Sequence, residues 1–135
     1  VVVREGTGAA ILNFGTLLDS AVTVADQLNS TVADMRFIKP IDQALIRSLT
    51  ETHDLLVTLE ENSIAGGAGS AVIEFLAAEG IVMPVLQLGL PDKRIDHGTQ
   101  AEQLVSINLD SDSIQSAITE RLKHLTGPAK VAQLH

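Results

Sequence analysis

The chain has 135 residues, of which 45% are apolar, so it is the size of one domain with enough apolar side chains for a core. It contains no cysteine, which excludes disulfides, thiolate nucleophiles and cysteine-ligated metals and suits a cytoplasmic protein. The net charge of −8 and the presence of only three aromatic residues argue against a nucleic-acid partner.

The first part of the chain predicts two strands followed by a helix. Val1–Val3 and Ala9–Phe14 are β-type runs on either side of Glu5–Gly8, a pattern typical of a hairpin. We expect the helix to begin at Thr16, with Asp19 as its partner in a capping box. Its predicted buried stripe consists of Leu18, Ala21, Val22, Ala25 and Leu28.

The middle of the chain alternates strand and helix. Thr31–Phe37 predicts a strand, and Leu55–Leu59 is a near-continuous apolar run, typical of a parallel strand that is buried on both faces. The stripe of the helix between them is predicted to contain Ile41, Ala44, Leu45 and Leu49. The stripe of the next helix is predicted to contain Ala68, Ala71, Val72, Phe75 and Leu76.

The last part predicts a strand at Pro84–Leu88, a short helix from Thr99 through Val105 and a final helix at Ser113–Leu125. Strands separated by helices indicate a three-layer α/β/α sandwich with a mostly parallel sheet of about five strands. The hairpin would add an antiparallel edge strand. We expect one domain over residues 1–126 and a flexible tail over residues 127–135.

Two further expectations concern the context of the domain. The apolar stretch Ile81–Leu86 is far shorter than the roughly 20 residues that span a bilayer, so no membrane segment is expected. Because the sequence begins with Val1 rather than methionine, we expect it to be a piece of a larger protein. No secretory leader is visible.

Ligands of open α/β sheets bind beyond the carboxyl ends of the strands, and three loops there carry unusual residues. In Asn13–Thr16, amides at a helix start could bind phosphate, but a tight turn at Gly15 followed by a cap is the favoured interpretation. In Gly89–Gln100, His97 could act as an acid or base, although an exposed or structural role is more common. The four histidines lack metal-type spacing, so no metal site is predicted.

The richest loop is Glu60–Ser70. Its adjacent carboxylates, Glu60 and Glu61, would point to opposite faces of an extended segment and would not converge on one substrate atom. Its glycines match neither the dinucleotide fingerprint nor a P-loop. We interpret them as allowing a helix start to approach another backbone closely, in this chain or in a partner. No catalytic or cofactor-binding residue is predicted.

Four motifs occur together in a specific order: LNFGT at Leu12–Thr16, DMRFIKPID at Asp34–Asp42, EENSIAGGAGS at Glu60–Ser70 and GLPDKRIDHGTQ at Gly89–Gln100. Together they resemble the C-terminal domain of the thiamine diphosphate-dependent transketolase family, over nearly the whole chain. The fourth motif is most similar to the branch that forms 1-deoxy-D-xylulose 5-phosphate. Arg94 departs from that pattern, in which an aromatic residue is common.

The resemblance implies a function for a larger enzyme. That enzyme would condense pyruvate with D-glyceraldehyde 3-phosphate and release carbon dioxide, for isoprenoid, thiamine and pyridoxal synthesis. Its thiamine diphosphate and magnesium would be held by N-terminal and middle domains, and it would be a cytoplasmic homodimer. No cofactor is then expected in this piece, which would be inactive alone. The residues expected to face the other domains or the approach to the active site are Glu61, Asn62, Gly66, Gly67, Gly69, Arg36 and His97.

Two alternatives remain open. The chain could be the equivalent docking domain of a 2-oxo acid dehydrogenase β subunit or of a transketolase, although the GLPDKRIDHG motif favours the synthase branch. It could also be a free-standing binder of small molecules that uses the glycine loop.

Overall fold

A computed structural model describes residues 1–15, 17–35, 41–60, 67–89, 105–106 and 110–125. The chain order of its elements is β1 (Val2–Arg4), β2 (Ala9–Asn13), α1 (Leu18–Leu28), β3 (Thr31–Asp34), α2 (Gln43–Thr52), β4 (Leu55–Glu60), α3 (Ala68–Glu79), β5 (Val85–Gly89), β6 (Val105–Ser106) and α5 (Ser111–Leu125). Among these residues, no helix is long and apolar enough to cross a bilayer.

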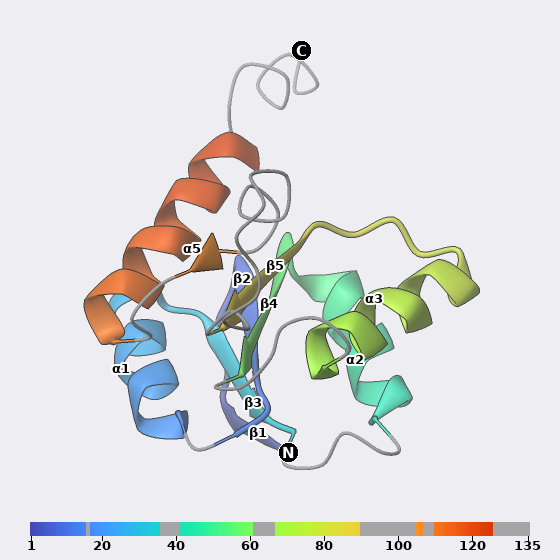
Figure 1. The fold of residues 1–135 in the computed structure, drawn as a ribbon, viewed down its shortest axis with the longest axis horizontal. Helices are drawn as coiled ribbons and strands as arrows, with labels where there is room; N and C mark the ends of the chain where they lie inside the picture. The colour runs from blue at the N-terminus through green and yellow to red at the C-terminus, as the bar shows by residue number, and fades with distance from the viewer. Residues whose placement is uncertain (16, 36–40, 61–66, 90–104, 107–109, 126–135) are drawn as a thin grey trace.

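The strands form one sheet in the order β1-β3-β2-β4-β5-β6. All neighbouring strands are parallel except the edge strand β1, which runs antiparallel to β3. Helices α1 and α5 cover one face of the sheet, and α2 and α3 cover the other (Figure 1). The predicted three-layer α/β/α sandwich is therefore confirmed, with six strands where about five were expected.

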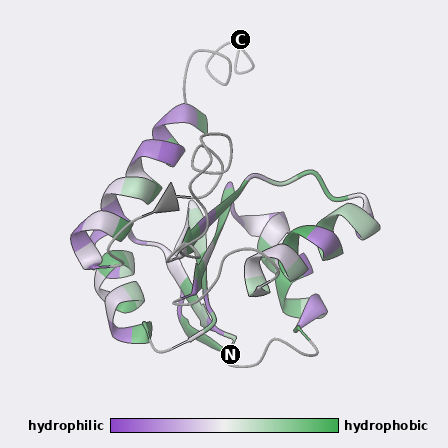
Figure 2. Cartoon of the chain, in the orientation of Figure 1, coloured by the Kyte–Doolittle hydropathy of each residue, from purple (hydrophilic) through white to green (hydrophobic). Residues whose placement is uncertain are grey.

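The core follows from the alternation of side chains along the strands. In β4, Leu55, Val57 and Leu59 belong to the cluster under α1 and α5, while Leu56 belongs to the cluster under α2 and α3. All six residues of β4 are buried, so the prediction of a strand covered on both faces is confirmed. In Figure 2 the central strands are coloured largely hydrophobic, and α5 carries many hydrophilic residues.

The predicted hairpin is wrong. β1 and β2 do not pair with each other, because β3 lies between them. The connecting residues cross the amino end of β3, where the Thr7 amide donates to the Asn29 carbonyl oxygen at 2.8 Å. β2 is fully buried and needs a neighbour on each side, whereas β1 is largely exposed and takes the edge. The expectation of an antiparallel edge strand is confirmed, but its partner is β3.

Several predicted helix details also change. α1 begins at Leu18 with no side-chain cap, and Thr16 lies outside the described residues. In α2, Ala44 is exposed and Ile46 is buried instead, because the helix begins only at Gln43, after Asp42 as its cap. Val105, expected to end a short helix, lies in β6, while residues 99–104 and the predicted tail 127–135 lie outside the described part.

Candidate functional site

The three candidate loops start at the carboxyl ends of neighbouring strands. They follow β2, β4 and β5, which are adjacent and parallel. The helix that follows β2, α1, lies on one face of the sheet, and the helix that follows β4, α3, lies on the opposite face (Figure 1). This is the topological switch point of the sheet, where ligands of doubly wound folds bind.

At the end of β2, the chain makes a tight turn. Asn13 is completely buried, and its Nδ2 donates to the Gly15 carbonyl oxygen at 3.0 Å. The next amide, that of Phe14, donates to the Leu59 carbonyl oxygen of β4 at 2.9 Å. These bonds use the Asn13 Nδ2 and the Phe14 amide within the chain, whereas the buried Oδ1 of Asn13 has no hydrogen-bond partner among the described residues. They favour the tight-turn interpretation of this loop over the phosphate-binding one.

At the end of β4, Glu60 points into the protein. Its side chain is only 7% exposed, and its Oε2 accepts a hydrogen bond from the Gly69 amide at 3.0 Å. Burial raises the pKa of Glu60, although hydrogen bonds from the amides of Gly69 and Ala68 lower it in part. The amides that begin α3, a natural anion site, therefore bind a carboxylate of their own chain.

Gly69 lies in the first turn of α3, directly over the sheet. A Cβ atom at this position would lie 2.6 Å from Oε1 of Gln87 and 2.8 Å from Oγ1 of Thr58. Thr58 and Gln87 are register partners on β4 and β5. The helix start thus approaches two strands of the same chain closely, which explains this glycine as a packing requirement.

Of the residues predicted to face other domains, the structure describes two. Gly67 is the N-cap of α3 with extended backbone, and Gly69 is buried two residues later. Arg36, Glu61, Asn62, Gly66 and His97 lie outside the described residues. The structure adds Thr58 and Gln87, which sequence reasoning missed, and Glu60, which it considered only as a rejected acid–base partner of Glu61. The available signal was the polar alternation in LLVTLE, which places Thr58 and Glu60 on one face of β4.

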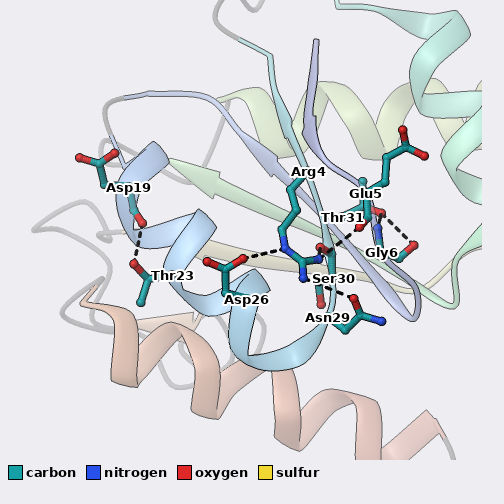
Figure 3. A network of polar contacts seen from close by, with 9 residues as sticks. All are labelled: Arg4, Glu5, Gly6, Asp19, Thr23, Asp26, Asn29, Ser30 and Thr31. Carbon is teal, nitrogen blue, oxygen red and sulfur yellow. Dashed lines mark hydrogen bonds and ion pairs between the residues drawn. The ribbon is translucent and has the colours of Figure 1, made fainter.

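The polar network of Figure 3 lies at the other end of the sheet. Arg4 pairs with Asp26 at 2.8 Å and donates to the Ser30 carbonyl oxygen at 2.7 Å. Thr31 bonds both backbone groups of Gly6. These contacts bind the β1–β2 connection to α1 and β3, which is a structural role. Over the described ranges, no three His, Asp or Glu side chains come together in a group that could hold a metal ion.

Comparison with known proteins places these features in a family. Residues 1–114 match the family described as "Transketolase, C-terminal domain". The 1-deoxy-D-xylulose-5-phosphate synthase of Hahella chejuensis (strain KCTC 2396) is 60% identical over 122 residues, which is 90% of this chain and 19% of that protein. The synthase of Vibrio parahaemolyticus serotype O3:K6 is 59% identical over 121 residues, or 90% of this chain and 20% of that protein.

A solved structure shares the fold. The "Split gene transketolase, inactive beta4 tetramer" has a TM-score of 0.75 and 30% sequence identity, over 91% of this chain and 42% of that one. The chain spans about a fifth of the length of the synthases that it matches.

Proposed function

Because this chain belongs to the family of transketolase C-terminal domains, we propose that it is the C-terminal domain of a 1-deoxy-D-xylulose-5-phosphate synthase. The observation that carries the proposal is the identity of 60% and 59% with two such synthases over 90% of the chain. The transketolase structure is less similar, at 30% identity. This difference favours the synthase over the alternatives of a transketolase or a 2-oxo acid dehydrogenase subunit.

The full-length enzyme condenses pyruvate with D-glyceraldehyde 3-phosphate, releases carbon dioxide and forms 1-deoxy-D-xylulose 5-phosphate for isoprenoid, thiamine and pyridoxal synthesis. When bound, thiamine diphosphate supplies carbanion stabilisation, and magnesium binds its diphosphate oxygens. In this proposal the N-terminal and middle domains hold both groups. The present domain supports the architecture of a cytoplasmic homodimer and has no activity alone.

The amino end of α3, as the structure describes it, does not fit thiamine diphosphate. A diphosphate at the amino end of α3 would meet the buried side chain of Glu60, which already accepts the Gly69 amide. Two like charges so close in a region of low dielectric repel each other strongly. We therefore assign no step of the reaction to this chain. Its proposed contribution is the surface around Glu61, Asn62, Gly66, Gly67, Gly69, Arg36 and His97, which faces the other domains.

Kinetic measurement on the full-length protein tests this proposal. We expect release of carbon dioxide from pyruvate to depend on D-glyceraldehyde 3-phosphate and on added thiamine diphosphate and magnesium. Transfer of a ketol group from a sugar phosphate donor, with no use of pyruvate, would instead identify a transketolase. Recovery of a lipoyl-bearing protein on affinity purification would identify a dehydrogenase subunit. Either result would reject the synthase assignment.

A further inference from the structure

Glu60 occupies a buried position where an apolar side chain would destabilise the fold less than a carboxylate does. It is 7% exposed, and it follows a strand of otherwise largely apolar residues. Beside it, Oγ1 of Thr58 and Oε1 of Gln87 are buried and have no hydrogen-bond partner among the described residues. A buried carboxylate and buried unpaired oxygens each cost stability. Several such destabilising groups together at the ends of neighbouring strands are typical of a region that is shaped for function.

The carboxylate acts as a helix cap over a long distance in the chain. A usual N-cap is the residue at the helix start, and its side chain bonds an amide two or three residues later. Here the N-cap is Gly67, which has no side chain, and the acceptor comes from Glu60, nine residues before Gly69. Because the cap lies on β4, its hydrogen bond joins a strand to a helix. It therefore fixes their relative position as well as stabilising the helix start.

Close packing reinforces that connection. The contacts of Gly69 with Thr58 and Gln87 leave no space for even a methyl group between α3 and the strands. In the register of the sheet, Glu60 is paired with Gly89, the last residue of β5. One carboxylate thus sets the start of α3 relative to the ends of both strands. β4 ends at Glu60, and Gly67, seven residues later, is the N-cap of α3.

We propose that Glu60 is a positioning residue, which holds the first turn of α3 against β4 and β5 and so fixes the edge of this domain that faces the rest of the full-length enzyme. The inference rests on the proposed function, since it assumes that this edge contacts domains that carry the cofactor. Glu60 touches no substrate in this account. It acts through the position of α3.

The test compares Glu60→Ala and Glu60→Gln in the full-length protein, with Glu74→Ala and Glu74→Gln as matched controls on the exposed face of α3. Hydrogen exchange at the amides of Gly69, Ser70 and Ala71 reports how stable the first turn of α3 is. Loss of a bond to a buried carboxylate should accelerate exchange in Glu60→Ala by about tenfold or more. Glutamine keeps an acceptor oxygen and should restore most of the protection.

The second readout is kcat/KM for pyruvate and D-glyceraldehyde 3-phosphate, measured well below the unfolding temperature of each variant. Misplacement of the edge that is proposed to face the cofactor-bearing domains should lower kcat/KM of Glu60→Ala by about tenfold, with rescue by Glu60→Gln and no change in the Glu74 variants. An unchanged kcat/KM in folded Glu60→Ala would overturn the positioning role, as would wild-type exchange rates in that variant. A wild-type protein without synthase activity would instead reject the proposed function, and hydrogen exchange would still decide whether Glu60 holds α3.

Discussion

At the scale of single residues, the edge of the sheet where β2, β4 and β5 end is unusually rich in buried polar groups. Asn13 and Thr58 are at most 1% exposed, and Glu60 is 7% exposed. Each lies within the last three residues of a central strand. Sequence reasoning found the adjacent carboxylates but assigned importance to Glu61, because the direction of the Glu60 side chain depends on where α3 packs. That packing is a tertiary property and leaves no mark on local spacing.

The buried carboxyl group of Glu60 predicts a specific pH dependence of stability. Burial raises its pKa in the folded state above the ordinary value of an unfolded chain, so the folded state binds this proton more readily. The contribution of Glu60 to stability is therefore largest at a pH below its ordinary pKa and is lost as the pH rises through its raised pKa in the folded state. Glu60→Gln has no such titration. Relative to the wild type, its midpoint of thermal unfolding should therefore increase as the pH rises from below the ordinary pKa to neutral.

The control for this experiment is Glu74→Gln, which makes the same chemical change at an exposed site of α3. The midpoint of Glu60→Gln, relative to that of the wild type, should change more over this pH range than the midpoint of Glu74→Gln does. An equal change for the two variants would contradict the effect of burial on Glu60.

Gly69→Ala tests the close approach of α3 to the sheet. The added Cβ would lie 2.6 Å from Oε1 of Gln87 and 2.8 Å from Oγ1 of Thr58, so these groups must move. We expect a loss of about 1–3 kcal/mol in the free energy of unfolding, measured by chemical denaturation. In the background of Gln87→Ala, one of the two clashes is absent, and the cost should be smaller. Equal costs in both backgrounds would contradict the close contact.

At the scale of elements, patterns that depend on local sequence were predicted well, and long-range pairing was not. The apolar run Leu55–Leu59 identified β4 as a buried strand. The predicted stripe of α3 was correct at four of its five positions, Ala68, Val72, Phe75 and Leu76. The hairpin failed because Glu5–Gly8 has the composition of a short turn. Nothing in these residues reveals that β3, which begins 23 residues after Gly8, takes the place beside β2.

The connection from β1 to β2 crosses the amino end of β3, which makes Gly6 critical for the position of β1. A Cβ there would lie 2.3 Å from the Asn29 carbonyl oxygen, a backbone atom that does not move easily. Gly6→Ala should therefore cost about 1–3 kcal/mol or more and accelerate hydrogen exchange in β1. Gly8→Ala, where nothing lies within 4 Å but φ is +75°, is the matched control and should cost about 1 kcal/mol. A smaller loss of stability for Gly6→Ala than for Gly8→Ala would argue against the crossing.

At the scale of the whole molecule, we propose that the loops at the carboxyl ends of the central strands face the other domains of the full-length enzyme. The sheet order around β2 and β4 creates a switch point, and the Gly69 amide at the start of α3 donates a hydrogen bond to Glu60 beside it. The sequence motifs already indicated the family, because such motifs are inherited by its members. They did not indicate how the described edge is built, since that depends on burial and on distances between strands. We propose a division of labour in which the remainder of the enzyme holds the cofactor and this domain does not.

Calorimetric titration with thiamine diphosphate and magnesium tests that claim most directly. The full-length protein should bind the cofactor saturably, whereas the 135-residue chain, confirmed as folded by circular dichroism, should release no binding heat. Stoichiometric binding at micromolar cofactor by the isolated chain would contradict the account.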